Sequence, residues 1–420
     1  MSAVREIRGC EVCGHQTLEA VLDLGMHPMC DDLVRIDEAR SCAEYPIEIL
    51  FCSRCVTAHQ RFQVPKETLF SRSYHYRSRF TADVLNGMTA LVASCQQALA
   101  TLAGATVVDI GCNDGSLLGK FRDAGAGATI GVEPTDACDD ARQAGHVTFN
   151  EFLSEEVARV IVSRYGAPRI VTMTNVFAHI EHLSGVLAAL KVLMGPETVV
   201  VIENHYLGAV LERNQFDTFY HEHPRTYSYT SFLHIARSLG VQVQRVELPS
   251  RYGGNIRVFL GHLPLADAGA VDLAELGARE AGYHADFARL RAEVGIWREN
   301  KLRQLAALVG ANGPLRAKAF PGRAAILIKL LGLDESTIAA VYEKPGSLKI
   351  GHFVPGTRIP IKSDDELLAL GDLTRPILNL AWHIPHEIRA YLSAHGYSGE
   401  VVDVVSAGDF ARHEPPPSRT

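Results

Sequence analysis

A short apolar run passes directly into a glycine-bearing loop in the stretch Val107-Val108-Asp109-Ile110-Gly111-Cys112-Asn113-Asp114-Gly115-Ser116. β-Branched residues fill the run, so we predict a buried strand over 106–110 and a helix from about residue 116. A strand that turns through glycine into a helix is typical of the ligand edge of a parallel sheet, because glycine lets the backbone approach a ligand closely. This stretch therefore predicts an α/β fold.

The chemistry of the loop distinguishes between ligands. Gly111 and Gly115 are four residues apart, so the loop is not the G-x-G-x-x-G fingerprint of a dinucleotide site. Asp109 and Asp114 would repel phosphate but can pair with an ammonium group. The next predicted strand ends at Glu133, which can accept hydrogen bonds from both hydroxyls of a ribose. Together these features resemble the class I methyltransferases that bind S-adenosylmethionine, with a nicotinamide dinucleotide as the alternative ligand.

Strands and helices alternate along the middle of the chain, which predicts a doubly wound parallel sheet. After a helix over about 81–102, further strands are expected at 129–132, 170–173 and 199–202, with helices near 136–144, 153–165 and 183–194. One or two long helices over about 270–310 then lead to a second, smaller α/β domain. Its strands are expected near 316–320, 337–343, 376–381 and 400–405, and its helices near 323–332 and 386–395.

Four of the nine cysteines form two C-x-x-C pairs, Cys10/Cys13 and Cys52/Cys55. Two such pairs in one segment are typical of a zinc ribbon, because each turn brings two thiolates to one tetrahedral metal ion. A site closed by four thiolates has no open position for a substrate, so we expect a structural zinc ion. The alternatives are a redox motif or four buried thiols, and the remaining cysteines have no partner spacing.

The composition excludes several classes of protein. The chain has 420 residues, which predicts several domains, and 47% of them are apolar, which excludes wholesale disorder. A net charge of −7 without a basic block makes a nucleic acid polymer or an anionic membrane a poor partner. Because every apolar run is far shorter than the roughly 18 residues of a membrane span, we expect a cytoplasmic protein.

Two polar clusters follow predicted strands and are candidates for the acceptor side of the site. The first is the segment 174–180, which includes His179, and the second is 216–223, which ends Tyr220-His221-Glu222-His223. Such a density of titratable groups is a reasonable place to seek a general base. A metal site in the second cluster is the weaker alternative, because adjacent side chains rarely converge on one ion. A polar surface loop is the other alternative, and it is our interpretation of His205 and His221.

At this point the order of the motifs resembles one family over nearly the whole chain. After the four-cysteine ribbon come Tyr-x-Tyr-x-Ser at 74–78, D-x-G-C-N-D-G at 109–115, N-x-x-x-H-I at 175–180, E-x-x-Y-L at 203–207, F-D-x-x-Y-x-E-H at 216–223, G-G-x-x-R at 253–257 and P-G-T-x-I-P-I at 355–361. This combination resembles the sugar C-methyltransferases of deoxysugar biosynthesis, which build branched sugars on a dTDP carrier. The resemblance implies an enzyme whose partners are S-adenosylmethionine and a nucleotide-linked keto-deoxysugar, and we expect the protein to be a monomer.

The resemblance also implies roles for individual residues. His223 matches the general base, Tyr220 and Glu222 stand beside it, and Tyr74 and His179 face the sugar. The zinc ligands match Cys10, Cys13, Cys52 and Cys55, and the cofactor edge matches Asp109, Gly111, Asn113, Asp114 and Glu133. We also assign Asn175 to the cofactor and Tyr76 to the substrate. The expected domains are a zinc-binding domain over 1–75, a methyltransferase domain over 76–265, a C-terminal α/β domain over 266–410 that helps to bind the nucleotide-sugar, and a disordered tail over 411–420.

The chain departs from the family pattern at two places. The family usually has aromatic residues after E-H, whereas here Pro224-Arg225 follow His223. The C-terminal domain reads Ala317-Lys318-Ala319-Phe320-Pro321-Gly322-Arg323 in place of a glycine-rich nucleotide turn. Candidate cations for a diphosphate are Arg257, Lys318, Arg323 and Lys344, with ordinary surface charge as the alternative. Two alternative functions remain. One is an O- or N-methyltransferase on the same scaffold, and the other is a non-catalytic zinc-dependent interaction module.

Overall fold

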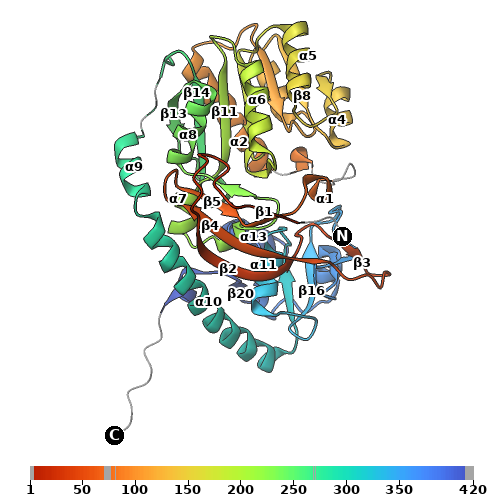
Figure 1. Cartoon of the computed structure of the whole chain (residues 1–420). Coiled ribbons are helices and arrows are strands. Elements are labelled where there is room, and N and C mark those ends of the chain that lie inside the picture. Colours follow the sequence, from red (N-terminus) through yellow and green to blue (C-terminus); the bar gives the residue numbers. More distant parts are fainter. Residues whose placement is uncertain (1–3, 71–76, 81, 268, 270, 412–420) are drawn as a thin grey trace. The chain divides into compact units, whose positions relative to one another are not determined.

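The computed structural model describes residues 4–70, 77–80, 82–267, 269 and 271–411 (Figure 1). The chain divides into two compact units, each made of several segments. The first unit consists of Met1–Ala20, Ile49–Arg213 and Glu222–His284, and the second of Val21–Glu48, Asn214–His221 and Ala285–Thr420. The division passes between His221 and Glu222, so the loop that carries the predicted base is shared between the two units.

The first unit is built on a seven-stranded sheet in the order β13-β14-β11-β10-β7-β8-β9. Its parallel strands are β7 (Thr106–Ile110), β8 (Ala128–Val132), β9 (Val147–Phe149), β10 (Ile170–Thr174) and β11 (Val199–His205). The strands predicted over this region are confirmed. At one edge the sheet continues with two antiparallel strands, β14 (Asn255–Gly261) and β13 (Gln242–Glu247), so it is mostly rather than wholly parallel.

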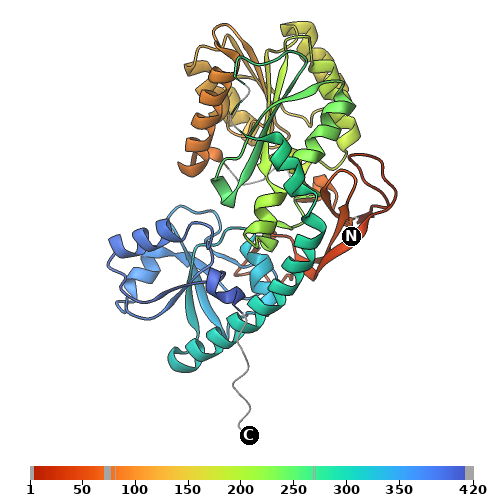
Figure 2. The same cartoon turned by 90° about the vertical axis from the view of Figure 1, so that its left-hand side faces the viewer.

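Helices cover both faces of this sheet, as Figure 2 shows for α2 in orange and for α5 and α6 in yellow. Because both faces are covered, the central strands are apolar along nearly their whole length. The helices are α2 (Ala82–Leu99), α3 (Ser116–Asp123), α4 (Ala137–Gln143), α5 (Glu155–Tyr165), α6 (Leu183–Leu193), α7 (Leu207–Glu212) and α8 (Tyr229–Leu239). On one face, α2 and α3 pack Leu91 and Phe121 against Val107, Ile170 and Phe259. This packing holds the carboxyl ends of the strands at one edge.

A four-stranded sheet carries the cysteine-rich segment in the order β12-β5-β4-β2. Its strands are β2 (Glu19–Pro28), β4 (Glu44–Cys52), β5 (Thr57–Gln60) and β12 (Arg225–Thr226). The strand β12 pairs with β5, with Arg225 opposite His59. The residues that directly follow His223 are therefore a strand of the sheet that carries the cysteines, which the sequence did not indicate.

The second unit contains the C-terminal α/β sheet, a fully parallel five-stranded sheet in the order β18-β16-β15-β19-β20. Its strands are β15 (Leu315–Lys318), β16 (Ile338–Glu343), β18 (Ile361–Ser363), β19 (Ile377–Asn379) and β20 (Val401–Asp403). The helices α11 (Ala324–Leu331) and α13 (Pro385–Ala394) confirm the two that were predicted, and α12 (Asp364–Ala369) was not predicted. The predicted long helical region consists of α9 (Leu273–Glu280) and α10 (Tyr283–Asn312).

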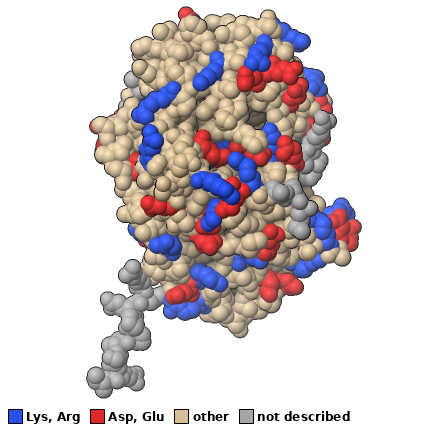
Figure 3. Space-filling view, viewed as in Figure 1, with Lys and Arg blue, Asp and Glu red and all other residues tan. Residues whose placement is uncertain are grey.

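Basic and acidic side chains are interspersed over the face drawn in Figure 3. This distribution agrees with the small net charge of −7. No helix in the described part of the chain combines the length and the apolar composition needed to cross a membrane.

Candidate active site and metal centre

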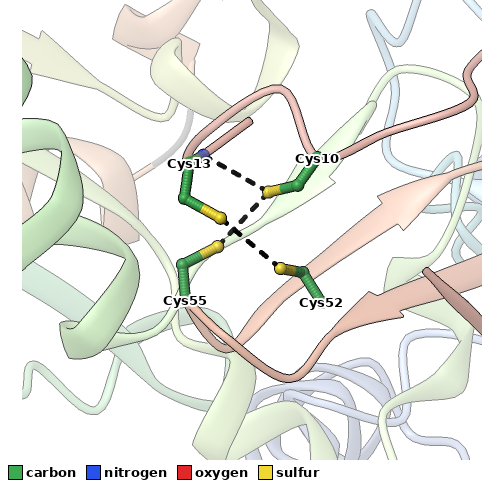
Figure 4. A group of neighbouring side chains, drawn as sticks. All are labelled: Cys10, Cys13, Cys52 and Cys55. Carbon is green, nitrogen blue, oxygen red and sulfur yellow. Dashed lines mark hydrogen bonds between the residues drawn. The ribbon is translucent and has the colours of Figure 1, made fainter. Parts of the chain in front are cut away.

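Four cysteine side chains converge from two turns of the first unit (Figure 4). Their sulfur atoms all lie within 4.8 Å of one another, with 3.3 Å between Cys10 and Cys55 and 3.6 Å between Cys13 and Cys52. Gly14 follows the first pair with a φ of 72°, a conformation that glycine adopts without strain. Four converging thiol groups match the tetrahedral coordination of a structural zinc ion.

The groups around the sulfur atoms fix the two cysteine turns in place. His59 Nε2 lies 3.3 Å from Cys10 Sγ, and the hydroxyl of Thr57 lies 3.0 Å from Cys55 Sγ. The same Thr57 hydroxyl is 2.8 Å from the hydroxyl of Ser231, in the first turn of α8. Polar contacts around the ligands orient them for the metal, so the zinc centre is joined directly to a helix that covers the large sheet.

Asp109 lies buried at the end of β7, where the sequence placed the cofactor edge. The Thr172 hydroxyl donates a hydrogen bond of 2.6 Å to its Oδ1. Burial, with a smaller contribution from the charge of Glu133, raises the pKa of the Asp109 carboxyl to about 7. After it the chain turns through Gly111, at a φ of 71°, where an added Cβ would lie 2.4 Å from Val176. The close approach explains why glycine is needed at this position.

Glu133, at the end of the neighbouring strand β8, is held by three hydrogen bonds. Its Oε1 accepts from the backbone N–H and the hydroxyl of Thr135 at 3.0 and 2.6 Å, and its Oε2 accepts from the N–H of Asn113 at 3.0 Å. Each carboxylate oxygen can accept two hydrogen bonds, so Oε2 has capacity for a ligand hydroxyl. Asp109 and Glu133 thus offer two fixed acids at adjacent strand ends.

Asn113 and Asp114 organise the loop itself. The side chain of Asn113 accepts a hydrogen bond of 3.0 Å from the N–H of Ser78, and that of Asp114 accepts one of 2.9 Å from the N–H of Arg79. Asp114 also accepts from the Ser116 hydroxyl at 2.6 Å at the start of α3. These contacts anchor residues 78–79 to the cofactor loop.

Asn175 provides a direct indication that a ligand belongs at this edge. It follows β10 in a left-handed conformation, with a φ of 54°, and its buried Oδ1 has no hydrogen-bond partner among the described residues. A buried amide oxygen without a partner is unfavourable, so a donor from a bound ligand would relieve it. The donors and acceptors at this edge fit a ligand with an ammonium group and a ribose.

Three histidine rings gather beyond the cofactor edge within the first unit. The ring centre of His223 lies 4.8 Å from that of His179 and 5.4 Å from that of His205. His179 Nδ1 is 2.7 Å from the main-chain oxygen of Glu222, which fixes Nδ1 as the protonated nitrogen of a neutral ring. Burial lowers the pKa of His179, which favours that neutral form.

His205 is the residue that sequence reasoning missed. We interpreted it as part of a polar surface loop, but its ring packs beside that of His223. Its position at the end of β11 could have identified it as a site residue. The strand β11 is the parallel neighbour of β10, and parallel neighbours bring their carboxyl ends to the same edge of the sheet.

The other residues of the predicted base cluster have separate environments. His221 belongs to the second unit, where its Nε2 is 3.1 Å from the carbonyl oxygen of Tyr45 and burial lowers its pKa to about 4. Tyr220 is half-buried in the same segment. Among the described residues the cysteine cluster is the only potential metal site found, so the alternative metal site at 221–223 has no support. Tyr74 and Tyr76 lie outside the described residues.

The candidate diphosphate cations are mostly engaged in ion pairs. Arg257 is buried and donates to Glu203 at 2.7 Å and to Glu247 at 2.6 Å. This environment supports neither a role in binding a diphosphate nor the alternative of an ordinary surface charge. Lys318 is likewise buried against Asp364, at 2.7 and 2.8 Å. Arg323 forms a two-pronged ion pair with Asp217, at 2.7 and 2.6 Å. Lys344 is exposed, with its Nζ 5.0 Å from the ring centre of Tyr391.

The fold and these two sites define an S-adenosylmethionine-dependent methyltransferase with an attached zinc-binding domain. Family models agree: a zinc-binding domain matches residues 10–70, a methyltransferase domain 82–246, and a C-methyltransferase C-terminal domain 250–402. The C-methyltransferase NovU from Streptomyces niveus is 30% identical over 391 residues, which cover 92% of each chain. The chain therefore belongs to this family of C-methyltransferases, and it binds S-adenosylmethionine and a structural zinc ion.

Solved structures of methyltransferases align with less than half of this chain. Magnesium protoporphyrin IX methyltransferase from Synechocystis with bound S-adenosylmethionine aligns over 48% of this chain and 98% of its own, with 14% identity and a TM-score of 0.33. The same enzyme with bound S-adenosylhomocysteine aligns over 43% of this chain and 81% of its own, with 16% identity and a TM-score of 0.32.

Cofactor affinity is expected to rise several-fold as the pH increases from about 6 to about 7.5. The pKa of Asp109 in the free protein is about 7, so its carboxyl is mostly protonated at the lower pH and cannot form the ion pair that we expect with the cofactor's ammonium group. The affinity should therefore increase as the pH passes upward through that pKa. Calorimetric titration with S-adenosylmethionine measures the effect. In Asp109→Asn we expect weaker binding with a flat pH profile, and an equally steep profile in that variant would contradict the assignment.

Proposed function

We propose that the enzyme transfers a methyl group from S-adenosylmethionine to a carbon next to the ketone of a nucleotide-linked keto-deoxysugar. The observation that carries this proposal is the packing of His223 against His179 and His205, in the same unit as the cofactor edge. Methylation of carbon requires a base, because a proton next to a ketone is very weakly acidic in water. The motif resemblance to sugar C-methyltransferases supports the acceptor class.

In this proposal His223 removes the α-proton of the sugar. A neutral imidazole has a pKa near neutrality and is suited to this step. The neutral His179, held to the Glu222 carbonyl oxygen, keeps a second ring at a fixed distance from the base. The carboxylate of Glu222 would orient His223, and Tyr220 or Tyr74 would donate a hydrogen bond to the enolate oxygen as its charge develops.

The cofactor supplies an electrophilic methyl group on a sulfonium. Asp109 and Asn175 would hold its amino acid part, and Glu133 its ribose. These residues come from the ends of β7, β10 and β8, so they position the methyl donor on the same sheet edge that leads to His179 and His205. Alignment of the two reactants contributes much of the rate in such a reaction.

We further propose that the C-terminal α/β domain over 266–410 helps to bind the nucleotide part of the substrate. Lys344 is exposed, which supports it as a contact for the diphosphate. Because Arg257, Lys318 and Arg323 each have a carboxylate partner, we assign them to the stability of their own units.

The proposal is tested by α-proton exchange and by the position of the methyl group in the product. We expect the zinc-loaded enzyme to exchange the proton next to the ketone of its keto-sugar for deuterium in heavy water. A panel of nucleotide keto-sugars with ¹³C-methyl-labelled S-adenosylmethionine, followed by mass spectrometry and NMR, should show a methyl on carbon. A methyl on oxygen or nitrogen, without exchange, would establish the alternative O- or N-methyltransferase instead.

A further inference from the structure

Arg225 is a fully buried arginine two residues after the proposed base. Its guanidinium donates to the carboxylate of Glu11, to the carbonyl oxygen of Ile180, to that of Glu181 at 3.3 Å, and to the hydroxyl of Tyr227 at 3.0 Å. A buried charge is stable only when it is paired and hydrogen-bonded, and here each of the three guanidinium nitrogens donates to at least one partner of suitable chemistry.

The partners of Arg225 lie in three separate segments of the first unit. Glu11 lies between the zinc ligands Cys10 and Cys13, and Gln63 also donates to it at 2.9 Å. Ile180 and Glu181 directly follow His179. Arg225 itself lies on β12, whose pairing with β5 is extended by a hydrogen bond of 2.8 Å from Gln60 N–H to the carbonyl oxygen of Pro224, next to His223. One side chain thus joins the zinc turn to the segments of both histidines.

We propose that Arg225 is a positioning residue that sets the distance between His179 and His223 and makes it depend on the zinc-bound turn. The inference rests on the proposed function, because that function gives the two histidines their role. It also gives the zinc ion an influence on catalysis without contact with the substrate. A bound zinc ion would fix Cys10 and Cys13, and the turn between them carries Glu11. Glu11 pairs with Arg225, which binds the two residues after His179 and itself lies two residues after His223.

Arginine is suited to this task for a geometric reason. Its planar fork presents five N–H donors in fixed directions, so it can bind a carboxylate and two carbonyl groups at once. Lysine has the same charge but one nitrogen, which cannot reach all of these acceptors. A misplacement of about 1 Å in a catalytic group can lower a rate by about 100-fold.

The first test compares Arg225→Lys and Arg225→Gln with the control Arg61→Ala in the full, zinc-loaded chain. Arg61 directly follows β5, the strand that pairs with β12, but it is partly exposed and pairs with Glu6. For both Arg225 variants we expect normal zinc content and cofactor affinity, a kcat lowered by about 100-fold and a KM changed by less than about threefold. Arg61→Ala should match the wild type in all four measurements.

The second test uses hydrogen–deuterium exchange, which is independent of turnover. In the wild type, removal of zinc should speed the exchange of peptides that cover 178–182 and 222–228. In Arg225→Lys the 178–182 peptide should already exchange fast with zinc bound, and removal of zinc should add little. Removing zinc from Arg225→Lys as well as from the wild type separates coupling through Arg225 from a general loosening of the zinc-binding domain.

Three results would overturn the inference. The first is a kcat in Arg225→Lys within about threefold of wild type, and the second is a parallel loss of zinc or cofactor binding, which would make Arg225 a residue of general stability. The third is unchanged exchange at 178–182 when zinc leaves the wild type, and this test stands even if the variants fail to fold. Methyl transfer is counted whichever atom receives it, so an O-methylated product would refute the proposed function and leave the test of Arg225 intact.

Discussion

Replacing His223 with alanine is expected to lower methyl transfer by about 10³-fold and to abolish α-proton exchange in heavy water. A positioned general base contributes about 10² to 10⁴ in rate, and the deprotonation of carbon is correspondingly slow without one. The affinity for S-adenosylmethionine should stay within about twofold of wild type, because the residues that we propose for cofactor binding, Asp109 and Glu133, lie at the ends of β7 and β8, away from His223. Mass spectrometry measures the exchange, and calorimetry measures the affinity.

The matched control for this experiment is His182→Ala. His182 lies three residues after His179, but its side chain is 62% exposed and its Nε2 lies 3.5 Å from the carboxylate of Glu181. We expect normal exchange in this variant. If His223→Ala still exchanged the α-proton at more than about a tenth of the wild-type rate, His223 would not be the base, and His205 would become the next residue to replace.

Replacing Cys55 with serine is expected to release the zinc ion and to lower the unfolding temperature of the zinc-binding domain by tens of degrees. Structural zinc contributes about 10–16 kcal/mol of apparent binding free energy, which is comparable to the whole stability of a domain, about 5–15 kcal/mol. Without the metal, three thiols and one hydroxyl would remain crowded where the four sulfur atoms now lie within 4.8 Å of one another. Zinc analysis and calorimetric unfolding measure the two effects, and methyl transfer should be lost with them because β12 is part of the same sheet.

Cys42→Ser is the control for the loss of a thiol. Cys42 is half-buried, donates to the carbonyl oxygen of Asp32 at 3.2 Å and belongs to the second unit. Its replacement should leave zinc content, unfolding and activity close to wild type. Retention of zinc and stability in Cys55→Ser would show that the cysteine cluster is not a structural metal site.

Local patterns were sufficient for the elements and for the metal ligands. Strands such as β10 and β11 are short runs rich in β-branched residues, and such runs can be recognised without knowledge of distant contacts. The two C-x-x-C pairs carry their geometry in their spacing, so Cys10, Cys13, Cys52 and Cys55 could be identified as one cluster. The two-residue β12 has no such local signal, because its pairing partner, β5, is far away in the sequence.

The sequence by itself determined the fold class, the zinc ligands and the placement of the acids Asp109 and Glu133 at strand ends, because strand ends and glycine turns are local features. Only the tertiary structure decided which polar groups meet. It placed His205 beside His223, paired Lys318 with Asp364 and joined Arg225 to the zinc turn, and each of these contacts bridges at least 18 residues of chain. Such contacts depend on how strands pair and on which charges are buried together, and residue patterns along one chain do not contain that information.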